Sequence, residues 1–149
     1  MNTAFPILGS ILLLVLFLFL FQLLTLRWVQ RRSRSAIWDR YTDNQIVMKS
    51  LAANFFGQTS KGKAQIRGNG ALVLSKNELW FRMALPQREL TIPLASITSV
   101  SIVKSHLGKT KLMPLLYVEF ISPAGIDSVA WLVEYPEEWM KAIGQVRHL

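Results

Sequence analysis

The feature that most constrains this chain is an uncharged apolar segment at residues 7–26. Only Gly9, Ser10, Gln22 and Thr25 interrupt its aliphatic and Phe residues. A helix of this length, at about 1.5 Å per residue, crosses the roughly 30 Å hydrocarbon core of a bilayer and satisfies its own backbone hydrogen bonds. The segment therefore predicts a transmembrane helix.

The charges around this segment predict its orientation. No charged side chain precedes it, whereas Trp28 and four arginines follow it at once, namely Arg27, Arg31, Arg32 and Arg34. Positive charge is enriched on the cytoplasmic side of a transmembrane span. We therefore expect a protein of the cell membrane (the inner or plasma membrane), with its N-terminus outside and everything after the span in the cytoplasm. A cleaved signal peptide carries its charge before the apolar run, so the pattern favours a retained anchor.

The remaining length suffices for one compact domain and a short connector. We expect an anchor with its basic flank at residues 1–32, a polar connector at 33–44 and a single domain at 45–149. In and beside the connector, Trp28, Trp38 and Tyr41 are amphipathic rings of the kind that lie at lipid headgroup depth.

After residue 45 the apolar residues follow the period of two that is typical of β-strands. Leu79, Phe81 and Met83, for example, share one face of a strand. Trp80 lies on the opposite face, either covered by a neighbouring element or free to anchor a partner. Seven strands are expected, at residues 46–55, 71–74, 78–83, 88–92, 97–103, 115–121 and 128–134. The inner face of the last one is ambiguous, because two apolar sets alternate along it.

The last segment returns to a helical period. Pro136 suits the first position of a helix, and Trp139, Ile143 and Val146 form one apolar stripe. The predicted fold class is therefore α+β, mainly β: a single transmembrane helix, then a seven-stranded antiparallel sandwich or barrel capped by one C-terminal helix.

Short sequence motifs carry a resemblance to a known family. Residues 68–75 read GNGALVLS, and they are followed by NELWF at 77–81, LTIPL at 90–94, ITSV at 97–100 and PEEW at 136–139. This order resembles the bacterial PH-like or GRAM-like branch of the pleckstrin homology-like superfold, over roughly residues 45–147. The resemblance implies a binding or scaffolding module rather than a catalyst.

Basic residues are the candidate binding groups. PH-like folds that bind phosphoinositides use cations of the first hairpin loop, and a similar region here holds Lys61, Lys63 and Arg67. A second basic loop, residues 105–111, holds Lys109 and Lys111 beside His106. These cations either meet lipid phosphates or simply solvate the loops, and the four arginines after the span either recognise headgroups or only orient the anchor.

No catalytic, cofactor or metal site is expected. His106 and His148, the two histidines, have no carboxylate at metal-ligand spacing, and no dinucleotide fingerprint or nucleophile elbow occurs. The absence of cysteine excludes thiolate chemistry and disulfides. The net charge of +8 would attract nucleic acid, but no recognition motif accompanies it, and no small-molecule substrate is evident.

The sequence thus favours a membrane-anchored PH-like module on the cytoplasmic face, which docks on anionic lipid of the inner leaflet or on a protein partner. The alternative is an accessory subunit of a larger membrane complex, with the span as the interaction element. In that case Gly9, Ser10, Gln22 and Thr25 would contact other helices.

Overall fold

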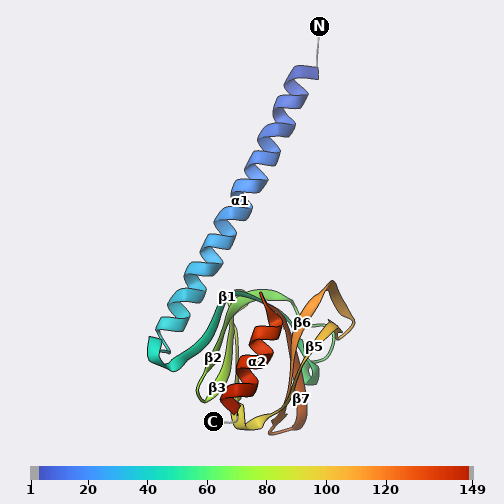
Figure 1. Ribbon diagram of the computed structural model, residues 1–149. Coiled ribbons are helices and arrows are strands. Elements are labelled where there is room, and N and C mark those ends of the chain that lie inside the picture. The colour runs from blue at the N-terminus through green and yellow to red at the C-terminus, as the bar shows by residue number, and fades with distance from the viewer. Residues whose placement is uncertain (1–3, 148–149) are drawn as a thin grey trace.

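The computed structural model describes residues 4–147, in which a long helix leads into a small β domain (Figure 1). The helix, α1, runs from Ala4 to Trp38, and a second helix, α2, runs from Pro136 to Arg147. Between them lie seven strands: β1 (Ile46–Gln58), β2 (Gly68–Ser75), β3 (Glu78–Met83), β4 (Arg88–Pro93), β5 (Ile97–His106), β6 (Lys109–Ser122) and β7 (Gly125–Leu132).

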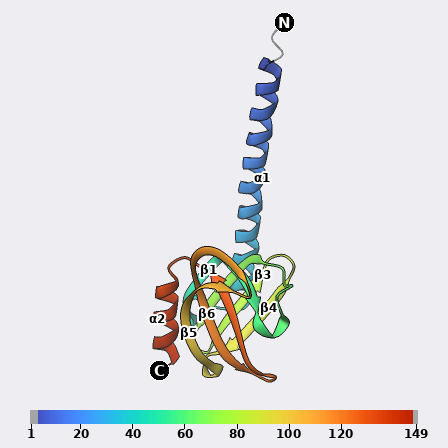
Figure 2. The same ribbon diagram turned by 90° about the vertical axis from the view of Figure 1, so that its right-hand side faces the viewer.

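The seven strands form one antiparallel sheet in the order β4-β3-β2-β1-β7-β6-β5. The sheet curves around a core, and α2 lies across its open side, against β1, β5 and β6 (Figures 1 and 2). The predicted layout of one N-terminal apolar helix, seven antiparallel strands and one C-terminal helix is confirmed.

Aromatic side chains fill the centre of the curved sheet. The rings of Phe55 and Phe81 stack with centroids 5.4 Å apart, and Trp131 lies 5.7 Å from Phe81. Trp139 and Ile143 of α2 are fully buried against this cluster, so the predicted apolar stripe is the face that closes the domain. Such rings bury the largest apolar areas of any side chains and hold the two ends of the sheet together.

The structure decides which face of β7 points inward. Val129 and Trp131 belong to the main core, whereas Ala130 packs on the outer face with Phe56 and Leu115. Both apolar sets of this strand are buried, and for this reason its alternation could not be assigned from the sequence.

The helix α1 does not end where the apolar segment ends. It continues without a break through residues 33–38, the first half of the expected connector. There Ala36 and Ile37 are buried against Ala71 and Val73 on the outer face of β2. The first half of the connector is thus the last part of α1, packed on the domain, and the second half is a short turn.

The helix satisfies the length and composition of a membrane span. The candidate span covers Gly9–Trp38, and none of its most apolar window is buried within the molecule. A soluble core helix would have that window buried. The side chains from Ile11 to Leu24 that are large and apolar are instead exposed.

Two predicted loops are shorter than expected. Gly57 and Gln58 continue β1, so the first loop begins at Thr59. The second loop is a tight turn of Leu107 and Gly108, which both have positive φ angles, as a two-residue hairpin requires.

Candidate functional site

The junction between α1 and the domain is built around Trp80. This side chain is only 1% exposed, because Ile37 and Tyr41 cover it on the outer face of β3. The Tyr41 ring meets it edge-on at 5.7 Å, and the indole Nε1 donates a hydrogen bond to Glu89 at 2.7 Å. Trp80 is therefore covered by its own chain. Tyr41, expected at headgroup depth, is part of this junction instead, so that expectation was wrong.

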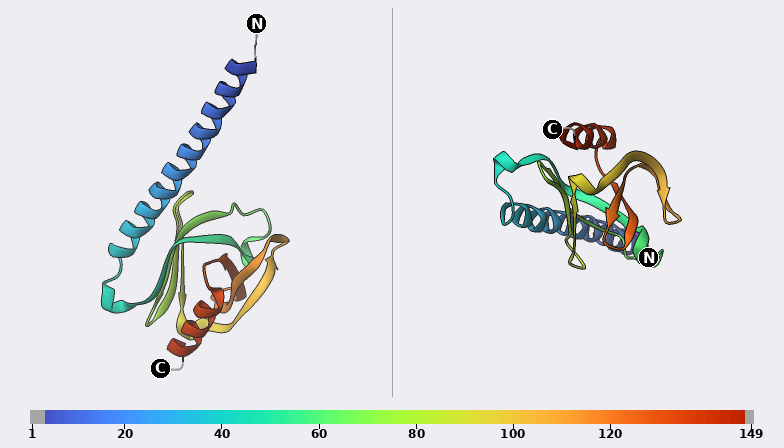
Figure 3. Two further views of the ribbon diagram at one scale, coloured as in Figure 1. Left: turned by 45° about the horizontal axis from the view of Figure 1, so that its top comes forward. Right: turned by 90° about the horizontal axis from the view of Figure 1, so that it is seen from below.

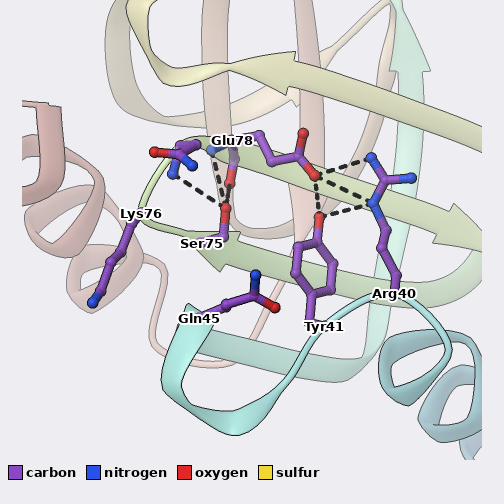
Figure 4. Close-up of a pocket in the computed structure, with 7 residues that line it drawn as sticks. Arg40, Tyr41, Gln45, Ser75, Lys76 and Glu78 are labelled. Atoms are coloured by element: carbon purple, nitrogen blue, oxygen red, sulfur yellow. Dashed lines mark hydrogen bonds and ion pairs between the residues drawn. The ribbon is translucent and has the colours of Figure 1, made fainter.

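Arg40 stabilises the junction through ion pairs and hydrogen bonds (Figure 4). Its guanidinium forms ion pairs with Glu78 at 3.0 Å and with Glu89 at 3.1 Å, which lie on β3 and β4. The Tyr41 hydroxyl accepts from Arg40 and donates to Glu78. Burial, followed by the Glu78 carboxylate, raises the pKa of Tyr41 well above its usual value. The end of α1 is thus fixed by apolar packing and by a charged network together.

An open pocket of about 410 Å³ lies beside this network (Figure 4). Its lining residues are Arg40, Tyr41, Gln45, Ser75, Lys76, Asn77 and Glu78. Since Arg40 and Tyr41 already hold the Glu78 carboxylate, this side chain is engaged in a structural contact. The pocket belongs to the helix–domain junction.

The four arginines that follow the apolar segment separate into two groups. Arg27, Arg31 and Arg34 line a shallow pocket with Gln30 on one side of α1. Arg32 lies over the Trp28 ring at 5.2 Å, and it donates to the amide oxygen of Gln87 at 2.7 Å when that amide is turned to accept. Three arginines therefore form one exposed basic face, while Arg32 ties α1 to the β3–β4 loop.

The C-terminal end of this basic face lies beside β1. A pocket of about 310 Å³ is lined by Arg34, Ile37, Trp38, Lys49 and Leu51. The Lys49 ammonium lies 4.5 Å from the centre of the Trp38 ring. Two cations and an exposed aromatic ring thus share one recess beside the helix.

The two predicted basic loops lie side by side. Lys109 donates to the backbone carbonyl of Gln65 at 2.7 Å, which joins the turn after β5 to the loop after β1. Arg67 lies 4.3 Å from the centre of the Phe56 ring. Lys61 and Lys63 are exposed on the first loop, and Lys111 is exposed on β6. The cations predicted in these two loops therefore form one region, separate from the four arginines that follow the apolar segment.

His106 does not belong to this exposed region. It is the last residue of β5, and it is buried with its Nε2 3.1 Å from the carbonyl oxygen of Gly57 and its ring against Tyr117. Burial lowers the pKa of His106, so it adds no charge at neutral pH. The expectation of a loop histidine was wrong, because β5 extends further than predicted. His148 lies outside the described residues.

Acidic partners are scarce throughout the described part of the chain. Within residues 4–147, both ion pairs belong to Arg40. The arginines that follow the apolar segment and the cations of the two loops have no carboxylate within ion-pair distance there. Their charges are therefore not neutralised within residues 4–147.

One structural carboxylate was missed by the sequence reasoning. Asp127 is buried at the start of β7 and accepts hydrogen bonds from the Ser60 backbone at 2.9 Å, the Ser60 hydroxyl at 2.7 Å and the Gln58 amide. Although burial opposes its charge, the bonds from Ser60 and Gln58 lower the pKa of Asp127 overall. It fixes the start of the first basic loop. A single Asp in a turn gave no signal of this role.

Apolar residues in a bulge of β6, just after the β5–β6 turn, were also missed. Leu112 is 91% exposed and Met113 is 51% exposed. The only sequence signal was that Leu112, Met113 and Pro114 follow Lys111 without alternation. Among the described residues, no cluster of metal-ligating side chains occurs.

Comparisons with known proteins give the fold but no family. No family model and no curated protein matches the chain. A chain of the 8S snRNP assembly intermediate is similar over 72% of this chain and 85% of its own length, with a TM-score of 0.57 at 8% identity. The C-terminal domain of an unknown protein from Leishmania infantum matches over 70% and 84%, with a TM-score of 0.50 at 12% identity.

A further similar structure is that of the linker and DH/PH domains of p115-RhoGEF. It has a TM-score of 0.47 at 16% identity, over 85% of this chain and 39% of that one. At these identities the first two likenesses show a shared fold alone. The features of this chain that bear on its function are the apolar helix α1 and the distribution of basic residues.

Proposed function

We propose that the chain is a single-pass membrane protein whose cytoplasmic β domain is a PH-like binding module that docks on anionic lipid or on a protein partner at the inner leaflet. The observation that carries this proposal is the continuity of α1. One unbroken helix contains both the apolar segment and the buried residues Ala36 and Ile37. The domain is therefore held beside the membrane on a rigid support rather than on a flexible tether.

The helix length supports a short distance between domain and lipid. From residue 26 to Ser33, the first buried residue after the apolar segment, the rise is about 10 Å at 1.5 Å per residue. The headgroup region occupies about 5–8 Å on each side of the hydrocarbon, and the Debye length at physiological salt is about 8 Å. Cations on the membrane side of the domain thus lie within the range of an anionic surface.

Charge supports the orientation and the ligand class. Arg27, Arg31 and Arg34 share an exposed face just after the apolar segment. Each cation near an anionic leaflet contributes about 1 kcal/mol of attraction. Since these arginines have no acidic partner among residues 4–147, that attraction is not offset within the described chain. A binding role accounts for this surface.

Two measurements test the proposal on the full chain. A C-terminal reporter that is active only in the cytoplasm should be active, and alkaline extraction should leave the protein in the membrane. An outward-facing C-terminus, or release by alkali, would refute the proposal. Affinity capture after mild detergent extraction then separates the lipid and protein ligands, since a stoichiometric membrane partner would favour the accessory-subunit alternative.

A further inference from the structure

Residues 111–114 of β6 form a bulge, where the pairing with β5 is interrupted a few residues after the β5–β6 turn, and this bulge exposes apolar side chains that nothing in the described chain covers. Leu112 is 91% exposed and Met113 51% exposed. Leu112 also has a φ angle of 57°, a left-handed conformation that is unfavourable for a side chain with a Cβ. The left-handed φ angle costs stability and the exposed side chain contributes none in return, so a role outside the folded core accounts for Leu112.

Cations surround this bulge. Lys111 directly precedes Leu112, and Lys109 lies two residues before Lys111. Lys104 lies opposite on β5, where its carbonyl accepts from Thr110 at 2.7 Å. The bond from Lys109 to Gln65 brings the loop with Lys61 and Lys63 alongside. None of these lysines has an acidic partner within residues 4–147. Exposed apolar side chains with lysines around them are complementary to a membrane interface, where the apolar side chains contact hydrocarbon and the lysines contact lipid phosphates.

The hairpin also lies on the correct side of the domain. In Figures 1 and 2 the β5–β6 hairpin lies at the end from which α1 emerges, whereas the turn between β6 and β7 lies at the opposite end. Figures 1 and 3 show that α1 leans over the half of the domain that carries β5 and β6. A bilayer placed across α1 therefore slopes toward the hairpin, and span tilts of about 20° are ordinary.

We propose that residues 110–114 form a second membrane contact, in which Leu112 and Met113 insert into the inner leaflet while Lys109 and Lys111 meet anionic headgroups. This inference rests on the proposed function and adds the docking surface to it. A protein partner fits less well, because specific interfaces bury about 800 Å² on each side and a bulge of four residues is much smaller. Together with α1, this bulge would fix the domain at two points.

The absence of cysteine in the chain makes the test specific. The full protein with Leu112→Cys carries a single environment-sensitive fluorophore and is reconstituted into vesicles of phosphatidylcholine and phosphatidylserine that contain nitroxide-labelled lipid. Ile126→Cys is the matched control, because Ile126 is 77% exposed but lies at the β6–β7 end. A probe at Leu16→Cys reports the span itself.

Nitroxide quenching several-fold stronger at position 112 than at 126 is the expected result. Adding Lys111→Gln should lower the docking equilibrium about five-fold, as the loss of one cation at an anionic surface predicts. Equal, weak quenching at 112 and 126 with strong quenching at 16 would overturn the second contact and leave the span intact. Weak quenching at 16 as well would refute the proposed function too.

Discussion

Replacing Ile37 by Ala tests whether the long apolar helix α1 is part of the folded domain. Ile37 is 1% exposed and lies against Ala71 and Val73, which have no exposed surface. Truncation of a buried Ile costs about 2–5 kcal/mol, and a site between a helix and a sheet collapses poorly. We therefore expect a loss of about 3 kcal/mol in the free energy of unfolding.

Urea unfolding of the full chain in a nonionic detergent, followed by Trp fluorescence, measures this loss. With a urea m-value of about 1.5 kcal/mol/M for a domain of this size, the midpoint should fall by about 2 M. The matched control is Trp38→Ala, one residue further on. Trp38 is 44% exposed and contacts Lys49, so its removal should cost about 0.5–1 kcal/mol.

Equal midpoints for Ile37→Ala and the wild-type chain would refute the packing argument. The domain would then fold without α1, and the anchor would act as a tether instead of a rigid support. Alkaline extraction of each variant confirms that the span is unchanged, since both positions follow the apolar segment.

Three other predictions use the same unfolding assay. Tyr41→Phe removes the hydroxyl that links Arg40 to Glu78 and should cost about 1 kcal/mol; no change would show that the ion pair suffices. Because the pKa of Asp127 is lowered in the folded protein, its contribution to the free energy of unfolding is complete above the usual Asp pKa of about 3.9 and is lost as the pH falls through the native pKa. Asp127→Asn should therefore reduce the loss of stability at acid pH. An unchanged dependence of stability on acid pH would contradict this. Gly70→Ala would place a Cβ on the carbonyl oxygen of Arg82 and should cost about 3 kcal/mol, whereas Gly144→Ala, in open space on α2, should stabilise by about 0.5–1 kcal/mol; similar effects at both sites would refute the close β2–β3 approach.

Most local elements were predictable because each has one dominant period, with β7 as the exception. Residues 78–83 were predicted as a strand, and the structure has β3 at the same positions. The C-terminal helix likewise begins at Pro136, as its turn chemistry indicates. The candidate cations could be named from composition, but their grouping could not. Lys109 and Gln65 are far apart in the chain and meet only through the fold.

The sequence by itself determined the long apolar helix, the strands and the closing helix, since apolar length and periodicity are local properties. Tertiary structure alone decided that α1 continues into the domain and covers Trp80, that His106 is buried, and that Leu112 remains exposed. The physical reason is that burial depends on which surfaces meet, and strand pairing brings together residues that no local pattern relates.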